Sequence, residues 1–327
     1  MELFDHLRFK IKHRGTRMVF PEATEARILG AAARLKVEQL LEPILIGREK
    51  DVYKALDGRG LQPSMFEIID PENYEHFKEM VVSFVERRRG KIDKEAAREL
   101  LLSDYNYFGT MLTYMNAADG MVSGIVHSTG DTVRPALQII KTRPGISRTS
   151  GAFLMVRGRD KEKYLFSDCA ININPSAQEL AEIAVESART AELFGINPKV
   201  SLLSFSTKGS AKSPEVDKVA EAAKIAKELA PEYEIDGELQ FDASYVEAVA
   251  HLKSPTSFVA GKATVFVFPD LQSGNIGYKI AQRLGNFEAI GPILQGLNKP
   301  ISDLSRGADE EDVYKLSIIT AAQTLLS

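Results

Sequence analysis

A short apolar strand, a loop of small polar residues and an amphipathic helix recur along this chain of 327 residues. Residues 18–20 form the first such strand, before a helical pattern over residues 25–41, and residues 263–268 form the most apolar one. Strands that alternate with helices favour α/β layers, because parallel strands need a long crossover that is usually a helix. We therefore expect an α/β fold with mostly parallel sheets and helices on both faces.

Two points rich in Pro, Gly or Asn flank the middle of the chain, at Pro144-Gly145 and at residues 298–300. Such points are typical of crossings between domains, and the chain is about twice the common domain length. A helical pattern near the C-terminus then returns to the first domain. We expect residues 1–144 and 300–327 to form a discontinuous first α/β domain and residues 145–299 an inserted second one.

Several local patterns predict individual elements. Two apolar runs, 152–156 and 164–166, predict a hairpin, and Ser176 with Glu179 predicts a capping box at a helix start. Ser213-Pro214 predicts another helix start, and a further helix is expected to begin near Pro135, because proline suits the first helical turn.

Composition excludes several classes of protein. Lys and Arg number 41 against 45 Asp and Glu, a net charge of −4, which argues against a dedicated nucleic-acid binder. The single cysteine, Cys169, excludes an internal disulfide framework and a cysteine-rich zinc site and fits a reducing compartment. The five histidines have no paired spacing, so we expect no metal. With no apolar run of roughly 18–20 residues and no signal-peptide pattern at the start, we expect a cytoplasmic protein without a membrane segment.

The loop over residues 127–134 is the first candidate site. The chain has no Walker, dinucleotide-binding or Gly-x-Ser-x-Gly motif, but its strand-to-helix loops are rich in Ser, Thr, Gly and Arg, and such loops lie where α/β sheets bind ligands. Ser128, Thr129 and Arg134 are the groups of a phosphate pocket, or of ordinary helix capping beside a surface arginine. His127 alone is more typical of a packed histidine than of an acid or base.

A second loop, over residues 304–312, places Ser305 and Arg306 before a helix, with Gly307 between them and the acids of the first turn. Asp312 fits simple stabilisation of the helix dipole. It also fits a proton acceptor one turn away from a Ser-Arg anion site.

A third loop over residues 272–279, after the buried strand, is expected to precede a helix and to cradle a phosphate or cofactor, or to be an ordinary turn. Cys169 follows a strand, where a covalent acyl-thiol is chemically possible but a small buried residue is more typical. The substrate-binding candidates in the third loop are Ser273, Gly274, Asn275, Tyr278 and Lys279.

These loops belong to longer motifs that follow one another in order. The chain resembles the phosphate acetyltransferase (phosphotransacetylase) family, which interconverts acetyl-CoA plus phosphate with acetyl phosphate plus CoA. The resemblance covers nearly the whole length, through residues 20–22, 106–112, 118–124, 127–129, 134–138, 168–172, 203–210, 237–243, 268–271 and 303–307.

The resemblance implies a fold similar to that of isocitrate and isopropylmalate dehydrogenases, with a cleft between two domains. It also implies a homodimer that acts in acetate metabolism. The implied substrates are CoA, acetyl-CoA, phosphate and acetyl phosphate, with no cofactor. Ser305 matches the serine that hydrogen-bonds the thioester or oxyanion, Arg306 the arginine that binds phosphate or the carbonyl oxygen, and Asp312 the carboxylate that deprotonates the CoA thiol.

Further residues carry over as ligands of phosphate or CoA. Arg134 matches an anion-binding arginine and Arg87 another, although Arg88 and Arg89 are adjacent to it. Ser128 and Thr129 fit as phosphate ligands. The implied mechanism is direct transfer in a ternary complex.

Several other functions stay open. Phosphate butyryltransferase is a related acyltransferase with a different acyl pocket. A decarboxylating dehydrogenase of the same fold needs a metal held by clustered aspartates and a nicotinamide site, and neither pattern occurs. A non-catalytic phosphate- or CoA-sensing module would not need the intact Ser305, Arg306 and Asp312. A route through an acyl-Cys169 intermediate is a further hypothesis.

Overall fold

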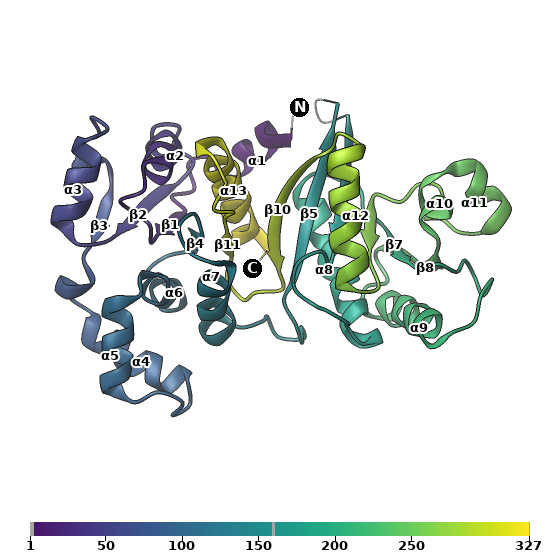
Figure 1. Ribbon diagram of the computed structural model, residues 1–327, viewed down its shortest axis with the longest axis horizontal. Coiled ribbons are helices and arrows are strands. Elements are labelled where there is room, and N and C mark those ends of the chain that lie inside the picture. Colours follow the sequence, from purple (N-terminus) through teal and green to yellow (C-terminus); the bar gives the residue numbers. More distant parts are fainter. Residues whose placement is uncertain (1–2, 159–160, 327) are drawn as a thin grey trace. The chain divides into compact units, whose positions relative to one another are not determined.

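The chain divides into two compact units in the computed structural model, which describes residues 3–158 and 161–326 (Figure 1). The middle unit spans Pro144–Gly296, and the outer unit combines Phe4–Arg143 with Leu297–Ser327. Each unit has its own sheet and its own buried apolar core.

The outer unit has a parallel sheet of five strands. Helices α2 (Ala26–Val37) and α13 (Glu310–Gln323) contact each other and cover one face, and α6 (Tyr105–Tyr114) packs on the other (Figure 1). Gly109 allows this close approach of α6, because a Cβ there would lie 2.9 Å from Val19 Cγ1. In spatial order the strands are β11 (Ile301–Asp303), β4 (Gly120–Ser123), β1 (Arg17–Phe20), β2 (Glu42–Ile46) and β3 (Glu67–Ile69).

The middle unit has a mixed sheet of six strands, in which β10 and β5, and β5 and β6, pair antiparallel while the others pair in parallel. Its core includes an aromatic cluster in which Phe153, Phe166 and Phe266 contact neighbouring rings. The strand order is β10 (Glu288–Gln295), β5 (Ser150–Arg157), β6 (Glu162–Ser167), β9 (Val265–Val267), β7 (Lys199–Leu203) and β8 (Glu234–Leu239).

Helices complete both units. The middle unit contains α8 (Ala177–Leu193), α9 (Pro214–Leu229), α10 (Phe241–Tyr245), α11 (Glu247–Lys253) and α12 (Leu271–Leu284). The outer unit adds α1 (Leu3–Ile11), α3 (Glu49–Asp57), α4 (Phe77–Arg87), α5 (Lys94–Ser103) and α7 (Thr129–Pro135), the last continued by a π turn over Ala136–Ile140. No helix in the described ranges is long and apolar enough to span a bilayer.

Most local predictions are confirmed. The hairpin is the β5–β6 pair, and the capping box of Ser176 and Glu179 and the Ser213 cap open α8 and α9. Residues 159–160, within the predicted hairpin connection, lie outside the described residues.

Three predicted boundaries are wrong. The helix expected near Pro135 begins six residues earlier, at Thr129, because Ser128 caps it there, and Pro135 ends α7 instead of opening it. The helix expected over residues 25–41 ends at Val37, since the chain must turn to enter β2. The third candidate loop lies entirely inside α12, which begins at Leu271 because the side chain of Asp270 accepts the N–H of Ser273.

Candidate functional site

Three neighbouring parallel strands of the outer unit end at one edge of its sheet. They are β11, β4 and β1, which lead into residues 304–309, 124–128 and 21–25. Asp303 pairs with Ser123, and the N–H of Leu304 donates to the Ser123 carbonyl at 2.7 Å. The first two candidate loops, far apart in sequence, therefore lie side by side at the sheet edge where ligands bind in α/β folds.

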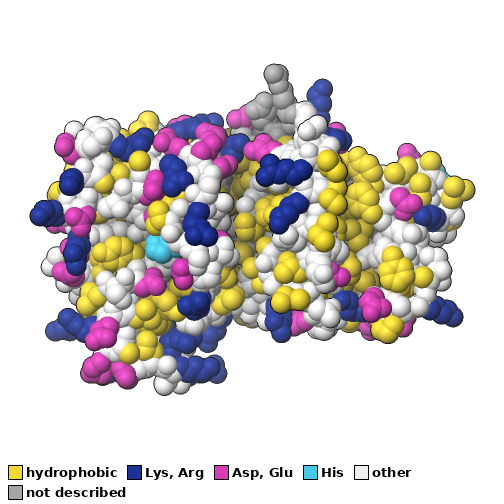
Figure 2. Space-filling view, viewed as in Figure 1, with side chains coloured by type: hydrophobic (Ala, Val, Ile, Leu, Met, Phe, Trp, Pro, Cys, Tyr) yellow, Lys and Arg dark blue, Asp and Glu magenta, His cyan; other side chains and the backbone are white. Residues whose placement is uncertain are grey.

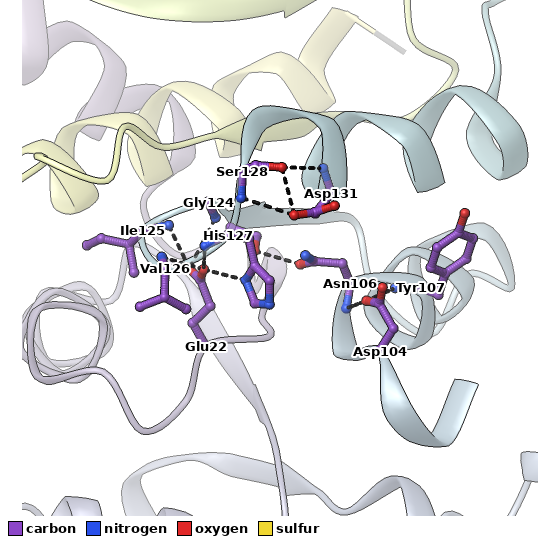
Figure 3. A network of polar contacts seen from close by, with 11 residues as sticks. Glu22, Asp104, Asn106, Tyr107, Gly124, Ile125, Val126, His127, Ser128 and Asp131 are labelled. Carbon is purple, nitrogen blue, oxygen red and sulfur yellow. Dashed lines mark hydrogen bonds and ion pairs between the residues drawn. The ribbon is translucent and has the colours of Figure 1, made fainter. Parts of the chain in front are cut away.

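A buried carboxylate holds the loop that follows β4. Glu22 Oε2 accepts the N–H groups of Gly124 at 3.1 Å and Ile125 at 3.0 Å, and Oε1 accepts those of Val126 at 2.8 Å and His127 at 3.2 Å (Figure 3). Oε1 also lies 2.7 Å from His127 Nδ1. Since the Glu22 side chain is only 1% exposed, these bonds replace the water that the charge loses on burial.

The Glu22 bonds shift both pKa values. Burial by itself raises the pKa of Glu22, but the bonds from His127 and the backbone outweigh burial and hold that pKa below its ordinary value. The same hydrogen bond raises the pKa of His127 against the opposing effect of burial. His127 is therefore a half-exposed ring bonded to a buried carboxylate, and not the isolated packed histidine that its position in the sequence suggests.

Ser128 acts as the N-cap of α7. Its Oγ lies 2.7 Å from Asp131 Oδ2 and accepts the Asp131 N–H at 3.3 Å, while the Ser128 N–H donates to the same carboxylate (Figure 3). The ordinary capping interpretation thus describes Ser128 in this structure. Thr129, the next residue, is exposed at the same turn. Contacts of either hydroxyl with phosphate stay a prediction.

Asp303, at the end of β11, is a buried acid beside this loop. Burial raises the pKa of Asp303, and the hydroxyls of Thr129 and Thr132 only partly oppose that effect. Its Oδ1 lies against Gly124 and has no hydrogen-bond partner among the described residues. Burial at this edge therefore favours the neutral form of Asp303.

The second candidate loop has a support that the sequence does not reveal. Arg27 Nη1 donates to the carbonyls of Arg306 at 3.2 Å and Ala308 at 2.8 Å, while Arg27 Nε pairs with Glu25 at 2.9 Å. Ser305 Oγ accepts the Gly307 N–H at 3.3 Å, which leaves the serine's own proton free to donate. Arg306 is exposed and forms no ion pair with a described carboxylate. The loop thus offers one hydroxyl donor and one unpaired guanidinium.

Asp312 lies in the first turn of α13, on the same loop–helix junction. Its Oδ2 accepts the Asp309 N–H at 3.0 Å, and its own N–H donates to Asp309 Oδ1 at 2.9 Å. The two residues form a capping box, and both are exposed. Asp312 thus stabilises the start of α13, as the sequence suggested, and its side chain stays open to solvent and to a ligand.

The candidate arginines divide into one with partners and one without. Arg87 donates from Nε to the Ile139 carbonyl at 2.5 Å and from Nη2 to that of Ile140 at 2.9 Å, so it caps the π turn. Arg134, on α7, is exposed and has no ion pair with a described carboxylate. Burial and the neighbouring Arg87 lower the pKa of Lys141, which marks a positive cluster here.

The third group of candidates lies in the middle unit, on α12. A Cβ on Gly274 would lie 2.2 Å from the Asp168 carbonyl oxygen, so this glycine serves close packing. Tyr278 stacks on Phe153 with ring centroids 4.1 Å apart. The other three make hydrogen bonds within the unit, Ser273 to Asp270, and Asn275 to both Cys169 and Lys279.

Cys169 is fully buried. Burial raises the pKa of its thiol well above the ordinary value, and Asp168 adds to the effect. A neutral, inaccessible thiol is a poor nucleophile, which favours the reading of Cys169 as a small packed residue. No group of three His, Cys, Asp or Glu side chains in the described ranges is arranged to hold a metal ion.

Two residues of this edge were missed as site residues in the sequence. Glu22 ends the Phe-Pro-Glu motif at the end of β1, and Arg27 is the second residue of the following helix, α2. The available signal was the position of an acid at the carboxyl end of a buried strand.

Comparison with known proteins decides the family. The model of the phosphate acetyl/butaryl transferase family matches residues 3–321. The chain belongs to this family. It is 57% identical to the phosphate acetyltransferase of Bacillus subtilis (strain 168) over 99% of each chain.

Solved structures of family members agree. A phosphotransacetylase from Streptococcus pyogenes is 61% identical with a TM-score of 0.97, and covers 99% of this chain and 98% of its own. The EutD phosphotransacetylase from Staphylococcus aureus is 55% identical with a TM-score of 0.93, over 98% of both chains. The mixed α/β architecture with two largely parallel sheets is thus that of these enzymes.

Proposed function

We propose that this chain is a phosphate acetyltransferase that moves an acetyl group reversibly between CoA and inorganic phosphate. The observation that carries the proposal is the junction at the edge of the outer sheet. Ser305, Arg306 and Asp312 lie within one loop and one helical turn, beside the loop that follows β4. Identity of 55–57% to phosphate acetyltransferases over nearly the full chain supports it.

The groups at the junction suit a direct transfer. Toward acetyl-CoA, Asp312 takes the thiol proton as sulfur attacks the carbonyl carbon of acetyl phosphate. Ser305 donates its free proton to the tetrahedral oxyanion, an interaction worth a few kcal/mol in related cases. The carbon–oxygen bond to phosphate then breaks, and Arg306 with Arg134 binds the leaving dianion. Both substrates are held together, so positioning supplies much of the rate.

Family membership does not fix the length of the acyl chain, since the family description covers both acetyl and butyryl transfer. We propose acetyl, because the 55–57% identical relatives are named phosphate acetyltransferases. CoA-dependent thioester formation from acetyl phosphate, compared with butyryl phosphate, tests this directly. Equal or greater turnover with butyryl phosphate would contradict it. Reduction of NAD(P) with a hydroxy acid would instead indicate a dehydrogenase.

The proton-acceptor role of Asp312 is tested by Asp312→Asn. The asparagine oxygen can still accept the Asp309 N–H, so the capping box stays while the base is lost. We expect turnover to fall by roughly 100-fold or more, with CoA affinity nearly unchanged, measured by steady-state kinetics and by calorimetric titration with CoA.

A matched control separates the base from the cap. Asp309→Asn alters the partner carboxylate of the same capping box and should change turnover by less than about threefold. Wild-type turnover in Asp312→Asn would show that another group takes the thiol proton.

The remaining parts of the proposal concern the whole enzyme. We propose an isocitrate dehydrogenase-like fold. A 4-hydroxythreonine-4-phosphate dehydrogenase from Klebsiella pneumoniae, 13% identical with a TM-score of 0.52, shows a likeness of fold alone. We also propose a homodimer in the cytoplasm, active in acetate metabolism, with CoA and phosphate as substrates and no further cofactor. The single cysteine fits a reducing compartment.

A further inference from the structure

We propose that Glu22 and His127 act as a pair that presents the imidazole Nε2–H to the phosphoryl group of the substrate, which makes His127 a phosphate-binding residue and Glu22 its positioning residue. The inference rests on the proposed phosphate acetyltransferase activity. It adds two residues to a junction in which only serine, threonine and arginine were expected to contact phosphate.

The first step is the orientation of the ring. An ionised carboxylate only accepts hydrogen bonds, so the 2.7 Å contact with Glu22 Oε1 makes Nδ1 a donor. The four backbone N–H bonds fix Glu22 itself, from Gly124 to His127. The ring therefore has its Nδ1–H on Glu22 and its Nε2 directed away from that carboxylate (Figure 3).

The second step is access. The His127 side chain is 35% exposed while Glu22 is 1% exposed, so the pair has a buried end and an open end. Among the described residues no hydrogen-bond acceptor occupies Nε2. His127 directly precedes Ser128 and Thr129. Arg27 interacts electrostatically with Glu22 and also donates a hydrogen bond to the backbone carbonyl of Arg306. The open nitrogen thus belongs to the same edge as the expected phosphate groups.

The third step is charge. The groups that face His127 are acids: Glu22 from the loop after β1, Asp104 at the start of α6 and Asp131 on α7. They favour the imidazolium, and Glu22 contributes most. Arg27 faces Glu22 from α2, and Arg134 lies near Asp131. When the ring is protonated, Nε2 is a charged donor for a phosphate oxygen. When the ring is neutral, Nδ1 keeps its proton on Glu22, and Nε2 presents a lone pair to the anion.

The consequence is a pH-dependent affinity for phosphate. Because the pKa of His127 is raised, the imidazolium persists above the ordinary histidine range, and affinity falls as pH rises through that pKa. Acetyl-CoA binding does not share this dependence, since the pair contacts only the phosphoryl group.

His127→Asn and His127→Gln separate the anchoring nitrogen from the binding nitrogen. The Asn amide replaces Nδ1 and keeps the bond to Glu22 without Nε2, whereas Gln reaches the Nε2 position and loses the anchor. We expect His127→Asn to keep the wild-type thermal midpoint and to raise the KM for phosphate roughly 10- to 100-fold, with the KM for acetyl-CoA within about twofold. His76→Asn is the control, because His76 is exposed and pairs with Glu79 at the surface.

Kinetics are measured from pH 6 to pH 9, and the ratio of variant to wild-type KM cancels the titration of phosphate itself. We expect this ratio to be largest at low pH and to approach 1 at high pH. The proposal would be overturned by an unchanged KM for phosphate or by a KM ratio that is independent of pH. Equal rises in the KM values for phosphate and acetyl-CoA would also overturn it, because they would indicate a structural role. An inactive wild type would overturn the proposed function instead.

A second measurement needs no His127 variant. In wild-type protein with labelled histidines, NMR titration gives the pKa of each of the five rings, assigned with His→Asn changes at the other four positions. Saturating phosphate should raise the pKa of His127 and leave that of His76 unchanged. An unchanged His127 pKa would overturn the proposal.

Discussion

At the scale of single residues, Gly124 controls how β4 leads into the candidate site. It has a φ of +115°, and a Cβ there would lie 2.5 Å from Asp303 Oδ1 and 2.7 Å from the Leu304 N and O atoms. Both the backbone conformation and the space therefore require glycine. The loop that Glu22 binds can adopt this conformation only if residue 124 has no side chain.

We predict that Gly124→Ala lowers the free energy of unfolding by more than about 3 kcal/mol, because a clash adds to the strain of a positive φ. Urea unfolding measures the change. Gly15→Ala is the matched control: its φ is +67°, but nothing lies within 4 Å of the added Cβ, so it should cost only about 1–2 kcal/mol. Equal losses in the two variants would show that contact with Asp303 and Leu304 is unimportant.

At the scale of elements, β8 is tied to the chain around it by one buried acid. Asp236 accepts Lys208 Nζ at 2.6 Å, Lys227 Nζ at 2.9 Å and Ser257 Oγ at 2.5 Å. Burial opposes ionisation, but these donors outweigh it and lower the pKa of Asp236 to about 2. Two lysines, from the loop after β7 and from α9, thus meet at one carboxylate on an edge strand.

This lowered pKa predicts a loss of stability in acid. The folded pKa lies below the unfolded value, so the contribution is complete above about pH 4 and is lost as the pH falls toward 2. It amounts to roughly 2 kcal/mol. In Asp236→Asn, unfolding monitored by circular dichroism between pH 5 and pH 2 should show a correspondingly shallower decline.

Asp242→Asn is the control, because Asp242 pairs with Lys253 at the surface, where solvent screens the charge. It should leave the acid profile close to that of the wild type. If Asp236→Asn followed the wild-type profile as well, the two lysines would not be stabilising β8 through this carboxylate.

At the scale of the whole molecule, an apolar row remains exposed on α12. Ile276, Ile280 and Leu284 are 57%, 53% and 81% exposed and follow one another at helical spacing. Apolar side chains gather over this helix in Figure 2. A row of this kind supports the proposed homodimer, because a second copy would remove it from water.

We predict a particle of twice 36.1 kDa in sedimentation equilibrium at micromolar concentration. Ile280→Glu, which places a charge in the middle of the row, should shift the mass toward 36.1 kDa. Val37→Glu, an exposed apolar residue of the outer unit, is the control and should not change the mass. A monomeric wild type would refute the dimer, and a dimeric Ile280→Glu would exclude α12 from the interface.

The sequence by itself determined the class of fold and the Ser305–Arg306–Asp312 junction. Both are local properties. Strands and helices each have their own hydrophobic period in the sequence, and a loop followed by a helix start places residues that are close in sequence near one another in space. The capping box of α8 was predicted for the same reason.

Only the tertiary structure decided which distant residues hold that junction. Glu22 bonds Gly124 across 102 positions of sequence, and Arg27 bonds Arg306 across 279. Gly274 lies inside α12, where its close approach to the Asp168 carbonyl leaves no room for a Cβ. Contacts of this kind leave no periodic pattern in the sequence. They form because parallel strands end at one edge of the sheet and because distant segments bury one another's side chains.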